Sequence, residues 1–178
     1  MPNAQPPHRE QPGVSSAHRL AMLQIAVEEE PGLVVDEREL QRSGLSYTID
    51  TLAELRGELG NEVAIYLCIG MDSLVTLASW KRWQELSDFA HLVVAARPGW
   101  QLPLTGEVAD WLADKVSTDP MALKSESAGR VLVEELTLLP VSATEIREAL
   151  EKGQSVRYLT PGRVIEYIKR HHLYEVEG

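Results

Sequence analysis

Three strand-like segments separated by helical segments constrain the fold of this 178-residue chain more than any other feature. Residues 64–69 are almost wholly apolar, as expected of a strand that is buried on both faces of a parallel sheet. Residues 91–96 and 130–135 predict two further strands. Helical patterns lie between them, at residues 72–90 and 107–116. Strands that alternate with helices predict an α/β fold around a mainly parallel sheet.

The flanking regions contribute helices. An apolar stripe predicts a helix over residues 15–27, and residues 46–59 predict another that ends at Gly60. Residues 33–35 are strand-like. A last helix is expected from Thr160, as its cap, and Pro161, at the first helical position, towards residue 171. No repeat or interior linker interrupts the sequence, so residues 1–178 are expected to form a single domain.

Charge and cysteine usage limit the partners and the compartment. The net charge is −10, which disfavours non-specific binding to nucleic acid or membranes, because both are polyanions. An anionic small molecule needs a local cluster of donors instead. Cys68 is the single cysteine and lies in an apolar run, which excludes a disulfide framework and favours a buried structural role. We therefore expect a cytoplasmic protein; its oligomeric state stays open.

Residues 141–149 predict an anion site at the start of a helix. Ser142 and Glu145 have the spacing of a capping box. Thr144 and Arg147 lie within the first two turns, beside backbone N–H groups that have no partner inside the helix. Hydroxyls, free amides, the positive end of the helix dipole and a guanidinium together are typical of a polyphosphate site. A well-capped surface helix with an incidental arginine is the alternative.

Three segments are expected to meet at one edge of the sheet. Residues 70–73 follow the first apolar strand, residues 97–99 the second and residues 142–147 the third. Ligands of such folds bind outside the carboxyl ends of the strands. The sequence therefore predicts that a carboxylate, a turn and an anion site converge there.

Taken in order, these segments resemble the bacterial nicotinate-nucleotide adenylyltransferases. The resemblance covers the whole chain and rests on residues 1–9, 36–40, 46–52, 69–74, 79–80, 97–99, 142–147 and 167–174. It implies a Rossmann-like, doubly wound, mainly parallel sheet with helices on both faces. It also implies an enzyme that transfers AMP from ATP to nicotinate mononucleotide, with Mg²⁺ accompanying ATP. Catalysis then rests on positioning two polyanions and neutralising phosphoryl charge.

The same resemblance implies roles for individual residues. For the ATP phosphates it implies Ser142, Thr144, Arg147 and Arg9; a solvated loop arginine is the alternative for Arg9. For adenosine it implies Gly70, Asp72, Arg97 and Pro98. Asp72 would accept the ribose hydroxyls, with a helix N-cap as the alternative. Arg97 and Pro98 would shape the adenine pocket.

For nicotinate mononucleotide the resemblance implies Ser46, Tyr47, Thr48, Trp80 and Lys81. Trp80 would stack on the pyridine ring, with core packing as the alternative. Thr48 would donate to the nicotinate carboxylate, with a helix cap as the alternative.

One family feature is not found in this sequence. The family begins with a strand and a G-x-F-x-P-x-H-x-G-H loop, whose histidines contact ATP phosphates. No histidine here has a comparable context, so no catalytic residue is assigned, and we expect the domain to lack its first strand-loop-helix unit. A catalytically incomplete nucleotide-binding fragment, or an enzyme acting on nicotinamide mononucleotide, stays an alternative. No metal site is assigned to protein side chains, since the adjacent His171 and His172 point about 100° apart on a helix.

Overall fold

The structure is a computed structural model of the whole chain and describes residues 14–96, 102, 105–137 and 141–174. Its contacts divide the chain into two compact units. One unit comprises Met1–Ser46 with Leu139–Gly178, and the other comprises Tyr47–Leu138. We describe each unit by itself, and the single domain stays a prediction.

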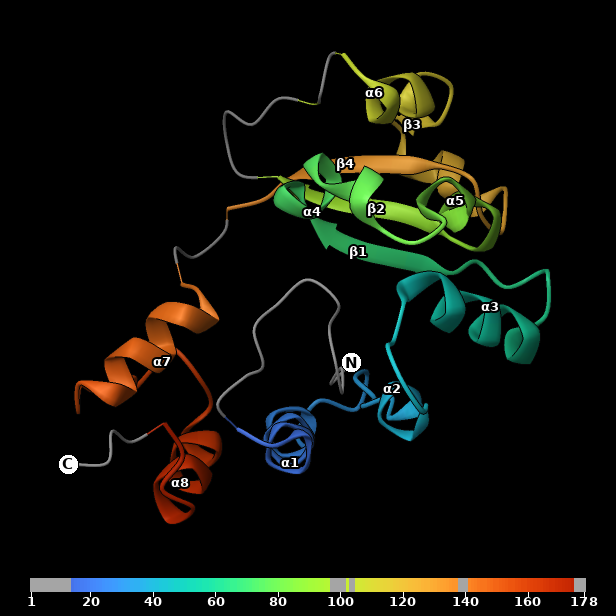
Figure 1. Cartoon of the computed structure of the whole chain (residues 1–178). Coiled ribbons are helices and arrows are strands. Elements are labelled where there is room, and N and C mark those ends of the chain that lie inside the picture. The colour runs from blue at the N-terminus through green and yellow to red at the C-terminus, as the bar shows by residue number, and fades with distance from the viewer. Residues whose placement is uncertain (1–13, 97–101, 103–104, 138–140, 175–178) are drawn as a thin grey trace. The chain divides into compact units, whose positions relative to one another are not determined.

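The second unit is built on a four-stranded sheet in the order β1-β2-β4-β3, in which every pair is parallel (Figure 1). The strands are β1 (Tyr66–Gly70), β2 (His91–Ala96), β3 (Val116–Ser117) and β4 (Val131–Glu135). The parallel α/β fold is therefore confirmed, and β2 has the expected bounds. β3 was not expected, because residue 116 was assigned to the preceding helix. That helix ends four residues earlier, and the two residues of β3 are too short a run to show an alternating pattern.

Helices of this unit pack on the face of the sheet that carries Leu92 and Val94, both fully buried. They are α3 (Thr48–Leu59), α4 (Met71–Val75), α5 (Leu86–Phe89) and α6 (Glu107–Leu112), with the 3₁₀ helices η1 (Leu77–Ser79) and η2 (Trp83–Glu85). Ile49 of α3 and Leu74 of α4 are almost fully buried in the same cluster. Gly60 ends α3 with φ of 82°, a conformation that favours glycine, as expected.

The opposite face of the sheet carries Tyr66 and Cys68, and both are exposed. The short helix η3 (Pro120–Lys124) lies on this side, where the Tyr66 hydroxyl donates to the Leu123 carbonyl (3.3 Å). The expectation that residues 64–69 are buried on both faces, with a buried Cys68, is wrong. β1 is an edge strand of the described sheet, and Ile65 and Ile69 alternate with the exposed residues, as in a half-covered strand.

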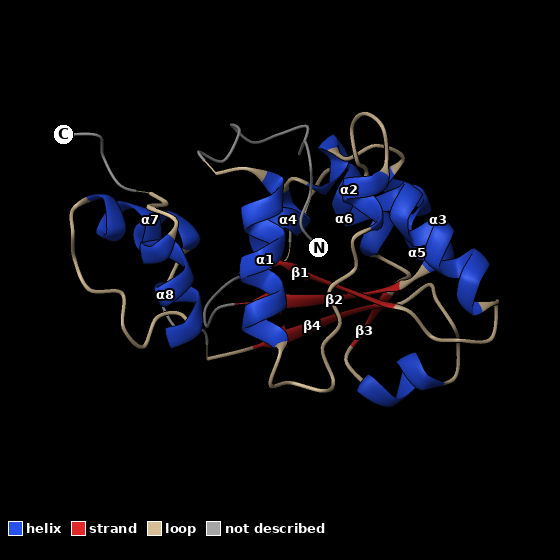
Figure 2. Ribbon diagram, turned by 90° about the horizontal axis from the view of Figure 1, so that it is seen from below, coloured by secondary structure: helices blue, strands red, loops and turns tan. Residues whose placement is uncertain are grey.

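The first unit contains four helices in its described residues (Figure 2). They are α1 (Ser16–Val27), α2 (Arg38–Gln41), α7 (Ala143–Glu151) and α8 (Gly162–Arg170). Val164 and Ile168 of α8 form a second apolar cluster with Val14 and Leu173, against which Met22 and Ile25 of α1 pack. Residues from the two ends of the sequence thus share one small core.

Two local expectations in this unit were wrong. Residues 33–35 form no strand, and Val34 is 89% exposed, because no strand among the described residues pairs with it. Pro161 occupies the N-cap position of α8 itself, with no side-chain cap, so Thr160 is not the cap. The helix at residues 15–27 is confirmed, with Ser15 accepting from the backbone N–H of His18.

Within the described part of the chain, no helix is both long enough and apolar enough to cross a bilayer.

Candidate functional site

Gly70 and Asp72 lie at the carboxyl edge of the sheet, where β1 passes directly into α4. Gly70 holds the N-cap position, and a Cβ at this position would collide with the Asp72 carboxylate. The alternative reading of Asp72 as the helix N-cap is therefore wrong. Asp72 is exposed in the first turn, and no hydrogen bond or ion pair of its carboxylate occurs among the described residues. The turn thus leaves a carboxylate open at the edge where ligands of such sheets bind.

Three residues expected at the pyridine-nucleotide site come together in the second unit. Lys81 places its Nζ over the Tyr47 ring, 4.3 Å from the centroid, and also lies 3.2 Å from Asp50 Oδ2. The neighbouring Trp80 is half-buried and packs against the core cluster. Trp83 is the more deeply buried tryptophan, in an edge-to-face contact with the Trp111 ring at 5.5 Å. The start of α3 and the segment 80–81 therefore form one local surface.

Ser46 and Thr48 have different surroundings. Ser46 is buried, and its hydroxyl donates to the Glu39 carbonyl (3.2 Å), so it holds the chain before α3. Thr48 is the first residue of α3, and Tyr47 occupies the cap position without a side-chain bond, so the reading of Thr48 as the cap is wrong. The carbonyl of Tyr47 accepts from Asp50 and Thr51, which leaves the first amides of the helix as donors.

The capping box at the start of α7 is confirmed. Ser142 Oγ accepts from the Glu145 backbone N–H (3.1 Å), and Glu145 Oε2 accepts from the Ser142 N–H (2.8 Å). Arg147 donates from Nη2 to Thr144 Oγ1 (3.2 Å), which orients the guanidinium along the first turn. Ser142 and Thr144 are exposed, and Arg147 is half-buried. A cation and the positive end of the helix dipole therefore act at one exposed turn.

Tyr174 lies close enough to this turn to sense its charge. Burial raises the pKa of the Tyr174 hydroxyl, and the positive charges of Arg147 and Arg19 oppose that increase. Arg19 is further held by a hydrogen bond from Nη1 to the Val14 carbonyl (2.7 Å). Sequence reasoning assigned no role to Arg19 or Tyr174. Nothing in the sequence around Arg19 indicates that its charge acts on Tyr174, 155 positions further along the chain.

The expected site residues are distributed over both units. Ser46, Ser142, Thr144 and Arg147 belong to the first unit, and the other described candidates belong to the second. Arg9, Arg97 and Pro98 lie outside the described residues.

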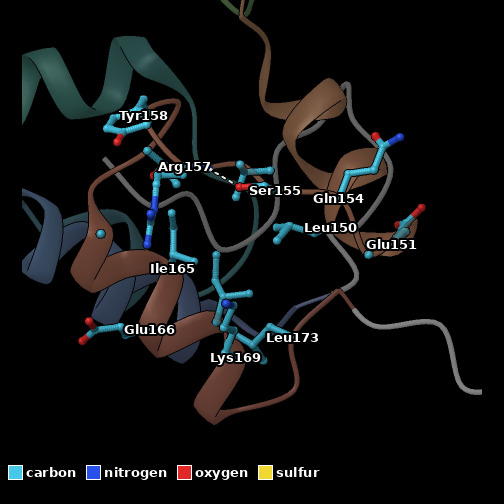
Figure 3. A pocket seen from close by; sticks show the side chains of 15 residues that line it. Leu150, Glu151, Gln154, Ser155, Arg157, Tyr158, Ile165, Glu166, Lys169 and Leu173 are labelled. Carbon is cyan, nitrogen blue, oxygen red and sulfur yellow. Dashed lines mark hydrogen bonds between the residues drawn. The ribbon is translucent and has the colours of Figure 1, made fainter.

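A groove of about 990 Å³ lies at the other end of α7, between that helix, the following loop and α8 (Figure 3). Its floor includes Leu150, Ile165 and Leu173, and Arg157 extends beside Ile165. Ser142, Thr144 and Arg147, the expected phosphate-binding residues that the structure describes, do not line it. This groove is thus separate from the capping-box turn.

Comparison with known proteins shows the family to which this chain belongs. The cytidylyltransferase-like family model matches residues 1–149 of this chain. Among curated relatives, the probable nicotinate-nucleotide adenylyltransferase of Aeromonas salmonicida is 49% identical over 177 residues, covering 99% of this chain and 82% of the relative. The protein with that same description from Cellvibrio japonicus is 47% identical, covering 98% of this chain and 82% of its own length. The chain belongs to the nicotinate-nucleotide adenylyltransferase family.

Solved structures agree on the fold. The Plasmodium falciparum nicotinic acid mononucleotide adenylyltransferase complexed with NaAD matches 90% of this chain and 75% of its own chain, with a TM-score of 0.61. The same enzyme complexed with APC matches with a TM-score of 0.56, covering 90% of this chain and 76% of its own. At 17% and 15% identity, these similarities confirm the nucleotidyltransferase type of α/β fold.

Proposed function

We propose that this chain transfers the AMP moiety of ATP to nicotinate mononucleotide, forming nicotinate adenine dinucleotide and pyrophosphate in NAD biosynthesis. The observation that carries the proposal is the 49% identity to an adenylyltransferase relative over 99% of the chain. The exposed donors at the start of α7 and the open carboxylate of Asp72 supply the chemistry such a reaction needs. A cytoplasmic location belongs to the same proposal.

The reaction needs no side-chain nucleophile. A 5′-phosphate oxygen of the mononucleotide attacks the α-phosphorus of ATP, and the bond from that phosphorus to the bridging oxygen of the β-phosphate breaks. Pyrophosphate leaves with the electron pair of that bond. The protein contributes positioning and charge stabilisation, which are the main sources of catalysis in phosphoryl-group chemistry.

Arg147 stabilises the charge on the departing pyrophosphate in this proposal. Its Nη2 is already oriented by Thr144 Oγ1 (3.2 Å), so little side-chain freedom is lost when an anion binds. Ser142 Oγ accepts from Glu145 N–H and still carries a hydroxyl hydrogen that can be donated. The dipole of the nine-residue helix α7 adds to the attraction. Arg9 is proposed as a further phosphate contact.

Mg²⁺ is proposed as the ion that accompanies ATP. In the described ranges, no group of three His, Cys, Asp or Glu side chains is arranged to hold a metal. Phosphate oxygens of ATP and water would supply most of the ion's ligands in this proposal. When bound, Mg²⁺ neutralises phosphate charge.

Asp72 and Gly70 are proposed to hold the adenosine, with Asp72 accepting the ribose hydroxyls. Arg97 and Pro98 complete the adenine pocket. Ser46, Tyr47, Thr48, Trp80 and Lys81 are proposed to bind nicotinate mononucleotide, with the Ser46 hydroxyl bonded to the Glu39 carbonyl. The cation of Lys81 over the Tyr47 ring supplies positive charge for an acidic ligand.

The test of the phosphate site compares two substitutions on one helix. Arg147→Gln should lower kcat/KM for ATP by about 10- to 100-fold, because a charge-assisted bond contributes about 1.5–3 kcal/mol. Lys152→Gln, which removes an exposed cation paired with Glu148 at the far end of α7, should leave pyrophosphate release unchanged. Equal effects of the two substitutions would contradict the proposed role of Arg147.

A further inference from the structure

Two histidines from opposite ends of the chain meet where α1 packs beside α8 (Figures 1 and 2). His18 lies in the first turn of α1, and His171 is the C-cap residue of α8. Their ring centroids are 5.1 Å apart, with 52° between the ring planes. Tyr167 joins the histidine pair: its hydroxyl lies 2.9 Å from His18 Nδ1, and its ring lies 4.3 Å from that of His171.

The separation of the two rings suits a shared metal ion. An imidazole nitrogen lies about 2.0–2.1 Å from Zn²⁺, which puts the ring centre about 3.2 Å from the ion. Two such rings at a tetrahedral angle have centres about 5.2 Å apart. The observed 5.1 Å between the two ring centroids matches this separation.

Tyr167 supplies a hydrogen bond of the kind that metal-binding histidines usually make. A ligating imidazole usually uses its second nitrogen in a hydrogen bond, which fixes the tautomer and the ring orientation. If His18 Nδ1–H donates to the Tyr167 hydroxyl, Nε2 keeps its lone pair for a metal. In that tautomer the phenol orients the His18 ring before any ion binds.

The electrostatic surroundings act in both directions. His171 caps the carboxyl end of α8, where free carbonyls and the negative end of the dipole attract a cation. Lys169 and Arg170 in the same turn, and the positive end of α1 at His18, oppose it. In the residues that the structure describes, no three His, Cys, Asp or Glu side chains form a metal cluster, so the protein offers two imidazoles and water completes the coordination. Such a site predicts moderate affinity.

We propose that His18 and His171 form a binding site for a borderline divalent transition-metal ion, such as Zn²⁺ or Ni²⁺, that clamps α1 to α8. The remote ends of the two helices are already joined by the ion pair between Arg163 and Glu28. An ion bound by the histidine pair would join the start of α1 to the end of α8. The site is independent of the proposed catalytic residues and of Mg²⁺.

Calorimetric titration of the full chain, carrying no affinity tag, with Ni²⁺ and with Zn²⁺ tests the proposal. One ion should bind per chain, and His18→Gln or His171→Gln should each weaken binding by at least about 10-fold. His172→Gln and His8→Gln serve as matched controls, and both should bind the ion as the unchanged chain does. Tyr167→Phe keeps both ligands but loses the orienting hydroxyl, and should weaken binding by about 10-fold.

Thermal melting provides a second readout. Ni²⁺ should raise the melting temperature of the unchanged chain and of the His172→Gln variant, because an ion that binds the folded state stabilises it. The increase should vanish in His18→Gln and His171→Gln, whose far-ultraviolet circular dichroism confirms that they are folded. Absence of binding, or binding that survives both substitutions, would overturn the proposal.

Discussion

Removal of the Arg56 side chain should destabilise the second unit. Arg56 lies in α3 and is 9% exposed. Its guanidinium donates to four backbone carbonyls: Gly60 (3.0 Å) and Val63 (2.5 Å) after the helix, Phe89 (2.6 Å) before β2, and Ser127 (2.9 Å) before β4. One side chain therefore connects the segments that lead into three parallel strands.

The loss of unfolding free energy in Arg56→Met depends on how many of the four carbonyls water can reach. Gly60 and Val63 are exposed, so water replaces the guanidinium there, whereas Phe89 and Ser127 are half-buried. The Ser127 carbonyl keeps one donor, the Ile65 N–H at 3.3 Å. Two charge-assisted bonds at about 1.5–2 kcal/mol each give a loss of about 3 kcal/mol. Methionine keeps the apolar stem, so little packing is lost.

Thermal unfolding followed by circular dichroism measures this effect. For a chain of this length, about 3 kcal/mol corresponds to a decrease of roughly 6–12 °C in the melting temperature. Arg82→Gln is the control, since Arg82 pairs with Glu85 on the surface and its loss should change the melting temperature little. An Arg56→Met variant that melts within about 2 °C of the unchanged chain would refute the reasoning.

Three further substitutions test other parts of the structure. Gly70→Ala should raise the KM for ATP in steady-state assays, because the new Cβ displaces the Asp72 carboxylate; an unchanged KM would show that this turn does not hold adenosine. The hydrogen bond from Arg130 holds the pKa of Glu126 in the folded chain below its ordinary value. The pair therefore stabilises the fold at any pH above the ordinary pKa, and this stabilisation is lost as the pH falls through the lowered pKa of the folded state. Glu126→Gln should therefore melt only slightly below the unchanged chain near pH 7, because an exposed pair contributes little, and the difference should close below about pH 4. A pH-independent difference would contradict this. Trp80→Leu should raise the KM for nicotinate mononucleotide while leaving the KM for ATP unchanged, and equal increases in both would indicate a loss of core packing instead.

Elements with strong local signals were predictable from the sequence. The bounds of β2 match because the five residues after His91 are apolar and the strand is central in the sheet, with neighbours on both sides. The start of α7 matches because a capping box is a contact within four residues. Such features depend on neighbouring residues in the chain, so the sequence pattern alone is enough to predict them.

Features that depend on distant partners were not predictable. The apolar run at residues 64–69 gave no sign that Cys68 faces outwards, because exposure depends on what covers β1. The strand-like residues 33–35 lack a neighbour to pair with. Nothing around Arg56 indicates that its acceptors include a carbonyl 71 residues away. The expected absence of the family's first strand-loop-helix unit stays a prediction.

The candidate site was predictable to a similar degree. The turn at Gly70 and Asp72 and the donors of α7 were placed by local pattern, and their geometry suits the expected chemistry. The contact of Lys81 with Tyr47 and the charges around Tyr174 are tertiary features. They could be found only once the packing of α3 and α8 was known.

Product identification tests the central claim most directly. The chain is incubated with ATP, Mg²⁺ and either nicotinate or nicotinamide mononucleotide. The products are then separated and identified by mass spectrometry. The account predicts nicotinate adenine dinucleotide with stoichiometric pyrophosphate, formed in preference to the nicotinamide product. Preference for nicotinamide mononucleotide would contradict the assigned acceptor, and the absence of any dinucleotide would contradict catalysis by this chain.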